Sequence, residues 1–291
     1  MSDIHVRKAL DLKAKAEKKL KGGLFGSFFG NKYEDAAELY EQAANSFKLG
    51  KKWEEAAQCF DQLAECHVKL ESIHEAASAM SSAAGCVKKA DPKKAIPFYN
   101  KSADYFCNLG RLGMAAKSYR EAAEQLEAVG ANVESLDFYE KAADLFETEN
   151  QTSETNKCKL KIATMNAELE KYNKAIKLFE DVAKKSVDNN LLKYSVKGYL
   201  LQAGICHLCI GSLEGSKEAL ERYEDLDVTF SGTREFKFIQ DLIAATEEGD
   251  VDQFTQVIGE FDSMTRLDAW KTKLLLRAKK ILEEGGEDDL T

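Results

Sequence analysis

Tyr33-Glu-Asp-Ala-Ala-Glu-Leu-Tyr40 is the first copy of a pattern that recurs along most of the chain. Each copy has a large residue, two further residues, a pair of mostly small residues, two more residues, and an aromatic or long aliphatic residue. The copies are 20, 20, 19, 20, 20, 40 and 41 residues apart and begin at Tyr33, Trp53, Ile73, Pro92, Leu112, Asn132, Tyr172 and Leu213. One such unit holds a helix and a turn, so two units form an antiparallel hairpin. Fixed-period repetition predicts a solenoid, which binds partners along an extended surface.

The composition narrows the class of protein further. The 291 residues include only 2 prolines, and alanine, leucine, glutamate and lysine are abundant, which favours an all-helical chain. The net charge of -9 argues against a general nucleic-acid-binding protein. We find no apolar signal core near the N-terminus and no apolar run long enough to span a bilayer. We therefore expect a cytoplasmic protein whose membrane contacts are peripheral.

The pattern predicts the organisation of the chain. We expect an all-α, TPR-like right-handed solenoid, or twisted sheet, of helical hairpins over residues 1–225, a C-terminal helical bundle over 226–284 and an acidic tail over 285–291. Residues 2–21 are predicted to form the first helix. Small pairs such as Ala76-Ala77 should let neighbouring helices approach closely. Glycines are predicted to end helices in the left-handed conformation at Gly50, Gly85, Gly110 and Gly130.

Four lysines recur in steps of 40 residues, at Lys117, Lys157, Lys197 and Lys237. If one hairpin takes 40 residues, they occupy equivalent sites on every second helix and share a face. Further cations lie close by in sequence, at Arg111, Lys161 and Lys193. A basic stripe of this kind suits a long acidic partner such as a bundle of helices. The alternative is that the register is accidental in a lysine-rich chain.

Two other segments have unusual patterns. Residues 22–30 place four large apolar side chains among glycines next to the basic first helix, at Leu24, Phe25, Phe28 and Phe29. Such a segment suits contact with an anionic bilayer, although its aromatic side chains could instead pack back on the first helices. The acidic tail ends with a penultimate Leu290. That tail is either solvated and inert or places its leucine in an apolar socket of a basic partner.

Nothing in the sequence supports catalysis or metal binding. The nucleotide-binding, hydrolase and metalloprotease motifs are absent, and the four histidines are dispersed. Cys206-His-Leu-Cys209 is the only closely spaced cysteine pair, and no second pair completes a zinc site. We therefore expect no enzymatic activity, no metal and no cofactor, and we interpret the cysteines as core residues.

Several stretches together resemble a known family. They are Lys88-Lys-Ala-Asp-Pro92, Gly110-Arg-Leu-Gly-Met-Ala-Ala-Lys117, Asn156-Lys-Cys-Lys-Leu-Lys161, Leu191-Leu-Lys-Tyr-Ser-Val-Lys197, Arg266-Leu-Asp-Ala-Trp270 and the acidic end with its leucine. Over essentially its whole length the chain resembles the soluble NSF attachment proteins. The resemblance implies a twisted sheet of helical hairpins that ends in a helical bundle.

The resemblance also implies a function. Members of the family are adaptors that bind the assembled SNARE complex and recruit the hexameric AAA ATPase called N-ethylmaleimide-sensitive factor (NSF). It assigns SNARE contacts to Arg111, Lys117, Lys157, Lys161, Lys197 and Arg234, and Lys193 and Lys237 complete the predicted basic surface. It assigns contact with the membrane surface to Leu24, Phe25, Phe28 and Phe29. It assigns ATPase contacts to the C-terminal end, at Glu247, Glu248, Asp288, Asp289 and Leu290.

A different function remains open from the repeat alone. A TPR-type co-chaperone or scaffold would clamp an acidic peptide in a basic groove of a similar helical solenoid. Its repeat is about 34 residues long, whereas the period here is 40 for a hairpin. The repeat length therefore favours the attachment proteins over this alternative.

Overall fold

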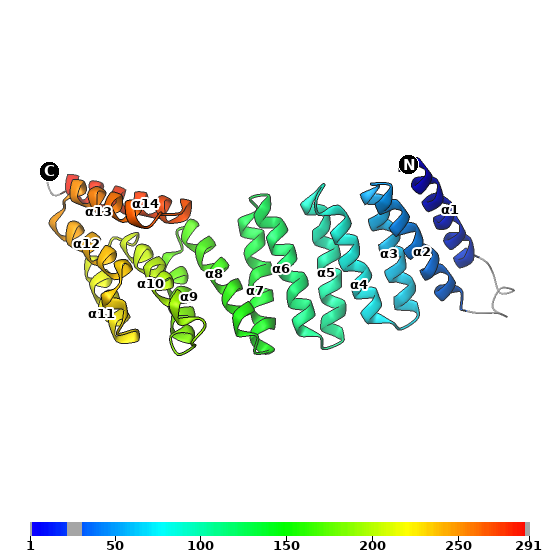
Figure 1. The fold of residues 1–291 in the computed structure, drawn as a ribbon, viewed down its shortest axis with the longest axis horizontal. Helices are drawn as coiled ribbons and strands as arrows, with labels where there is room; N and C mark the ends of the chain where they lie inside the picture. Colours follow the sequence, from blue (N-terminus) through cyan, green and yellow to red (C-terminus); the bar gives the residue numbers. More distant parts are fainter. Residues whose placement is uncertain (1, 22–30, 289–291) are drawn as a thin grey trace. The chain divides into compact units, whose positions relative to one another are not determined.

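The structure is a computed structural model that describes residues 2–21 and 31–288, and within them every regular element is a helix (Figure 1). The all-α, TPR-like class is thus confirmed. The helices are α1 (Ser2–Lys21), α2 (Lys32–Leu49), α3 (Trp53–Lys69), α4 (Ile73–Val87), α5 (Pro92–Asn108), α6 (Leu112–Ala128), α7 (Asn132–Thr148), α8 (Thr152–Glu168), α9 (Tyr172–Ser186), α10 (Lys193–Leu208), α11 (Leu213–Leu226), the short 3-10 helix η1 (Phe230–Gly232), α12 (Arg234–Glu248), α13 (Val251–Met264) and α14 (Ala269–Asp288).

The chain divides into two compact units, Met1–Cys158 and Lys159–Thr291. The expected boundary between solenoid and terminal bundle, near residue 225, falls inside the second unit and stays a prediction. None of the helices in the described ranges has the length and apolar content of a bilayer-spanning helix.

In the first unit, each helix from α1 to α7 packs against the next one in sequence. The small pairs make this close packing possible, as predicted, because Ala56, Ala76 and Ala115 have no exposed surface. The large residues that follow them, such as Tyr40 and Met80, fill the space beside each pair and are also buried. Alternation of small and large side chains along each helix therefore builds this core.

Ion pairs show that the repeat in space is 40 residues long. Lys94 on α5 lies 2.6 Å from Glu54 on α3, and Lys101 on α5 lies 3.1 Å from Asp61 on α3. Both pairs join residues 40 positions apart. On the other side of the hairpins, Lys88 at the end of α4 pairs with Glu121 of α6 at 3.0 Å. Odd-numbered and even-numbered helices therefore form two layers within this unit.

The turns between helices use a left-handed residue more regularly than they use glycine. Gly110 and Gly130 have φ of 67° and 74°, as predicted. The prediction is wrong for Gly50, which has φ of -79°, and for Gly85, which lies inside α4. Non-glycine residues take the left-handed conformation in other turns, at Lys51, Glu71, Asn150 and Glu170. The chain reverses at a fixed position in each repeat, whichever residue is there.

The second unit has a core built by α9 to α14 around large buried side chains, among them Phe179, Leu200 and Phe254. Helix α14 is tied to the C-terminal part of α8. The indole N–H of Trp270 donates to the Thr164 carbonyl at 3.1 Å, and Arg277 donates to the carbonyls of Ala167 and Glu168 at 3.2 and 3.1 Å. Arg277 thereby supplies donors to carbonyls at a helix end, which lack partners within the helix.

Candidate interaction surfaces

The four lysines spaced by 40 residues all lie on even-numbered helices, namely α6, α8, α10 and α12. Lys117 and Lys157 each lie five residues after the first residue of their helix, at Leu112 and Thr152. All four lysine side chains are exposed. Two of them, Lys117 and Lys157, belong to the first unit, and the other two belong to the second unit.

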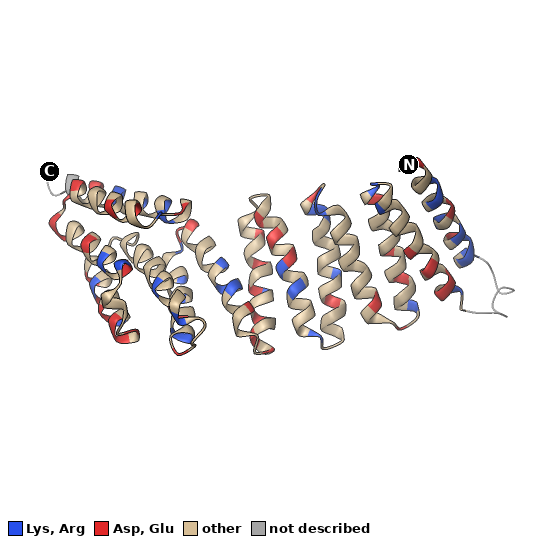
Figure 2. Cartoon of the chain, in the orientation of Figure 1, with Lys and Arg blue, Asp and Glu red and all other residues tan. Residues whose placement is uncertain are grey.

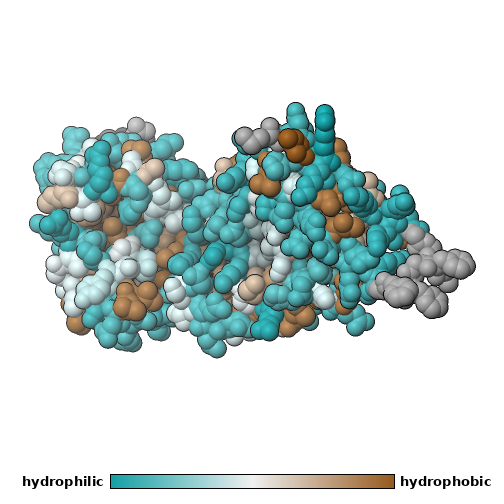
Figure 3. All heavy atoms as spheres, turned by 45° about the vertical axis from the view of Figure 1, so that its right-hand side comes forward, coloured by the Kyte–Doolittle hydropathy of each residue, from teal (hydrophilic) through white to brown (hydrophobic). Residues whose placement is uncertain are grey.

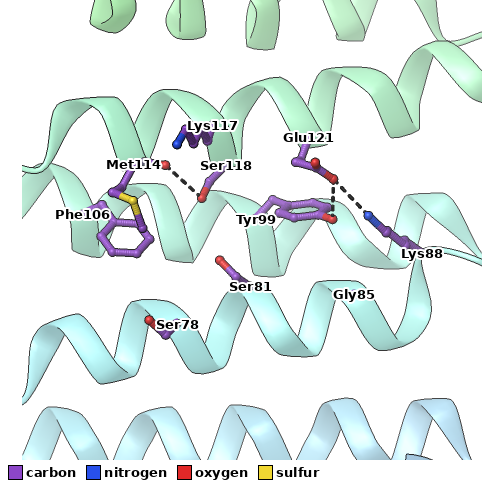
Figure 4. A pocket seen from close by; sticks show the side chains of 10 residues that line it. All are labelled: Ser78, Ser81, Gly85, Lys88, Tyr99, Phe106, Met114, Lys117, Ser118 and Glu121. Atoms are coloured by element: carbon purple, nitrogen blue, oxygen red, sulfur yellow. Dashed lines mark hydrogen bonds and ion pairs between the residues drawn. The ribbon is translucent and has the colours of Figure 1, made fainter. Parts of the chain in front are cut away.

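In the first unit, Lys117 borders a shallow groove of about 400 Å³ formed by α4, α5 and α6 (Figure 4). Small residues on α4, including Ser78, Ser81 and Gly85, line the groove, and so does Met114 of α6, which is 40% exposed. A Cβ atom on Gly85 would meet nothing within 4 Å, so a partner could approach α4 closely there. The groove therefore combines one exposed cation with apolar and small polar surface.

The far end of this groove is fixed by a hydrogen-bonded group of three side chains. Glu121 accepts hydrogen bonds from Lys88 at 3.0 Å and from the hydroxyl of Tyr99 at 3.1 Å (Figure 4). The hydrogen bond to Glu121 raises the pKa of Lys88. Burial, and then the charge of Glu121, raise the pKa of Tyr99 to about 12. Lys88 is thus neutralised locally, whereas Lys117 has no ion pair with any described residue in the structure.

Lys157 is held in place by a network between α6 and α8. Its ammonium group lies 2.7 Å from Glu154, which also forms an ion pair with Arg120. The hydrogen bond from Lys157 lowers the pKa of Glu154, and the charge of Arg120 adds to this effect. Arg120 is anchored over the ring of Phe146, 5.6 Å from its centroid. The network leaves the Lys157 side chain 63% exposed. Arg111, the other predicted cation here, is exposed at the turn before α6.

In the second unit, the predicted cations lie on α8, α10 and α12, and each is exposed: Lys161, Lys193, Lys197, Arg234 and Lys237. Lys197 of α10 forms an ion pair of 3.0 Å with Glu235 of α12, whose side chain is only 13% exposed. Both residues line a pocket of about 330 Å³ together with Tyr199 and Lys271. Glu235 therefore fixes the direction of Lys197.

Sequence reasoning missed two residues of this surface. Leu191 is 89% exposed and Tyr194 is 76% exposed, on either side of Lys193. The Lys193 ammonium lies 5.5 Å from the centre of the Tyr194 ring, and Asn190 accepts a hydrogen bond from it at 3.3 Å. The pair Leu191-Leu192 was visible in the sequence, but only the structure distinguishes the exposed leucine from its partly buried neighbour.

At the end of α12, Glu247 and Glu248 border a groove of about 450 Å³. Its other walls are mostly apolar and come from α10, α11, α13 and α14, with Leu213, Phe254 and Leu282 among the lining residues. Glu247 is paired with Lys217 at 2.7 Å, and both glutamates are exposed. The groove offers apolar surface beside negative charge.

Several predicted contact residues cannot be assessed. Leu24, Phe25, Phe28 and Phe29, as well as Asp289 and Leu290, lie outside the described residues. The backbone of Asp288 ends α14, but its side chain is not described. The membrane contact and the tail contact therefore stay predictions.

The cysteines belong to the packed interior. Cys206 and Cys209 are 0% and 3% exposed, and the Cys209 thiol donates to the Leu274 carbonyl at 3.2 Å. Burial raises the pKa of Cys209 to about 12, which leaves the thiol protonated and unreactive. Within residues 2–21 and 31–288, no three His, Cys, Asp or Glu side chains are grouped so as to hold a metal ion.

Taken together, the helical hairpins, the exposed cations and the acidic groove define a helical-repeat protein whose surfaces suit macromolecular partners rather than small substrates. The chain belongs to the soluble NSF attachment protein family. The family profile described as "Soluble NSF attachment protein, SNAP" matches residues 7–283. Members of this family are attachment proteins, so the chain is not an enzyme.

Individual relatives match over nearly their full length. An alpha-soluble NSF attachment protein of Vitis vinifera is 47% identical over 290 residues, which cover 99% of each chain. The vesicular-fusion protein SEC17 of Coprinopsis cinerea is 43% identical and covers 93% of this chain and 94% of its own. Among solved structures, the TPR protein YrrB is similar with a TM-score of 0.40 at 17% identity, over 68% of this chain and 93% of its own.

Proposed function

We propose that this chain is an adaptor that binds assembled SNARE complexes through the exposed cations of its even-numbered helices and recruits and stimulates an NSF-type AAA ATPase, so that SNARE complexes are disassembled during vesicle traffic. The membership in the attachment-protein family supports this proposal. Two relatives are named for attachment to NSF and for vesicular fusion, respectively. The observation that carries it is the regular placement of exposed lysines on α6, α8, α10 and α12.

Electrostatics suits this role better than deep pockets would. The chain carries -9 overall, so a set of exposed cations on one kind of helix is a local exception that favours an acidic partner. Lys157 and Lys197 are oriented by Glu154 and Glu235, which reduces the side-chain freedom that is lost on binding. Binding through several weak contacts raises the effective concentration at the next contact to roughly millimolar.

A disassembly assay tests the proposal. Fluorescently labelled SNARE complex, an NSF-type ATPase, ATP and this chain are mixed, and dissociation is followed by loss of energy transfer between the SNARE subunits. We expect dissociation only when both the ATPase and the chain are present. Dissociation at the same rate without the chain would refute the adaptor role.

The exposed apolar residues beside Lys193 should add to SNARE binding. Replacing Leu191 and Tyr194 by serine removes apolar surface that a partner would bury, and we expect the dissociation constant for SNARE complex to rise about tenfold. Because this contribution is apolar, the loss should change little between low and high salt. Fluorescence anisotropy in a salt series measures it, with Val228→Ser as the control, since Val228 is 82% exposed elsewhere in this unit. An unchanged affinity for the double variant would exclude Leu191 and Tyr194 from the interface.

The C-terminal leucine is expected to act on the ATPase alone. Leu290→Ala should leave the affinity for SNARE complex unchanged and lower the ATP hydrolysis that the chain stimulates severalfold, because a single anchoring side chain in a socket contributes about 1.5–3 kcal/mol. Thr291→Ala, one residue further on, is the matched control. Stimulated hydrolysis that is equal for both variants would rule out a role of Leu290.

A further inference from the structure

Helix α1 has a charge opposite to that of the rest of the chain. It contains seven lysine and arginine residues and three acidic residues, a net charge of +4 in a chain whose total is -9. The remaining residues therefore carry -13. Figure 2 shows these cations along most of the length of α1. This concentration is separate from the lysines of the even-numbered helices that the proposed SNARE contact uses.

The apolar side of α1 is already occupied. Ala9 and Ala16 are fully buried and Leu12 is 8% exposed in the core shared with α2. The opposite side of the helix is exposed and carries six cations: Arg7, Lys8, Lys15, Lys18, Lys19 and Lys21. Because its apolar residues are committed to α2, α1 cannot insert into a bilayer as an amphipathic helix does. It can only present its charged side.

Two of the six cations are neutralised within the protein. Lys15 forms an ion pair with Asp11, and Lys19 forms one with Asp35 of α2, both at 2.6 Å. The other four form no ion pair with any residue in the described ranges: Arg7, Lys8, Lys18 and Lys21. They lie on one side of the helix, since residues 7, 8, 18 and 21 fall within roughly 140° of one another at 3.6 residues per turn.

We propose that this outer face of α1 binds the headgroups of anionic phospholipids. The inference rests on the proposed membrane contact of residues 22–30 and gives that contact a lipid preference. The partner is a lipid surface rather than an acidic protein because α1 leads directly, at Lys21, into the apolar segment proposed to contact the bilayer. Hydrophobic contact supplies binding to any bilayer, and the cations of α1 select those with negative charge.

The face shows none of the usual features of a protein-binding surface. In the view of Figure 3, hydrophobic side chains occur in separate groups, and no continuous apolar band accompanies the hydrophilic surface. On α1 itself the exposed large apolar residues are Ile4 and Leu10, at 70% and 54%. Charged residues separate them, whereas protein interfaces have an apolar centre.

Vesicle flotation tests the proposal on the full chain. The vesicles consist of phosphatidylcholine alone or contain about one-third phosphatidylserine, which gives a negative surface potential. The test variant replaces Arg7, Lys8, Lys18 and Lys21 by glutamine, which keeps good helix propensity. The control variant removes the same charge from exposed residues elsewhere in the first unit, by glutamine at Lys51, Lys69, Lys89 and Lys93. A third variant replaces Phe25, Phe28 and Phe29 by serine.

Each cation near an anionic surface strengthens binding about fivefold, so we expect the α1 variant to bind the phosphatidylserine vesicles at least about 50-fold more weakly. Its binding to phosphatidylcholine should not change, and the control variant should bind like the original chain. Equal losses for the two glutamine variants, or no loss for the α1 variant, would overturn the proposal. Loss of SNARE-complex binding with vesicle binding intact would also overturn it and assign the face to a protein.

The same experiment separates this inference from the membrane contact beneath it. If the original chain binds both vesicle types equally and the phenylalanine variant binds neither, the membrane contact stands and the role of α1 is refuted. If the original chain binds neither vesicle type, both proposals fail. Circular dichroism of each variant confirms that the helices are intact.

Discussion

Reversing the charge of Lys117 and Lys157 together should weaken binding to the SNARE complex by at least about 100-fold at roughly 0.1 M salt. Each substitution by glutamate replaces an attraction to the acidic partner with a repulsion, and both residues are exposed at equivalent places on α6 and α8. Because the interaction is electrostatic, the difference between variant and original chain should shrink as salt is raised.

The control for this prediction lies on an odd-numbered helix. Lys174 and Lys177 of α9 are exposed, so Lys174→Glu with Lys177→Glu gives the same change in net charge on a different layer. That variant should keep nearly full affinity. Equal losses for the two double variants would mean that overall charge, and not the surface of the even-numbered helices, governs binding.

Glu154 complicates the variant at position 157, because a glutamate there would face the Glu154 carboxylate in place of the present ion pair. Local repulsion could disturb α8 without any effect on a partner. Lys157→Gln avoids this repulsion and should still lower the affinity, by about fivefold. Thermal denaturation of each variant shows whether the helices are intact.

The largest effect on stability is expected from Ala76→Glu. Ala76 has no exposed surface, and α4 packs against α3 and α5 in the first unit. A glutamate at this position would bury a carboxylate without a partner or force the helices apart, at a cost of several kcal/mol. We expect a fall in the melting temperature of roughly 10 °C or more, measured by circular dichroism.

Ser82→Glu is the matched control because Ser82 is exposed on the same helix. Its hydroxyl bonds only to the Ser78 carbonyl, so the variant should melt within about 2 °C of the original chain. If Ala76→Glu melts at the same temperature as Ser82→Glu, the small pairs do not set the spacing of the helices.

The repeat in the sequence was sufficient to predict most of the fold. The pairs of small residues recur with the helix period, so they identify both the helices and their buried side, and Ala76 and Ala115 are buried as expected. Helix α8 has lost the alanine pair of the repeat but keeps its place. A lattice of equal units tolerates the loss of one copy because neighbouring units fix its position.

The turns show where the sequence could not be followed. Glycine marks a left-handed residue at Gly110 and Gly130, but Lys51 and Glu71 take the same conformation without it. Packing of the helices on both sides determines each reversal, and a residue with a Cβ atom accepts the strain of about 1 kcal/mol. Gly85 was misread because a glycine inside a helix and a glycine after it look alike in sequence.

The candidate surfaces were predictable in position but not in detail. The step of 40 residues located Lys117 and Lys157 on alternate helices. It could not reveal that Arg120 and Glu154, 34 residues apart, form the support for Lys157. Nor could it show that Glu235 holds Lys197 or that Leu191 is exposed. Such contacts depend on side-chain directions across neighbouring helices, and hydrophobic periodicity carries no information about them.

The central claim is that this chain links the SNARE complex to the ATPase. Preassembled SNARE complex immobilised on beads is incubated with an NSF-type ATPase in the presence of a non-hydrolysable nucleotide, with and without the chain, across a salt series. We predict that the ATPase is retained only when the chain is present, and that chain and ATPase are lost together as salt rises. ATPase retention without the chain, or chain retention that is unaffected by salt, would contradict the account.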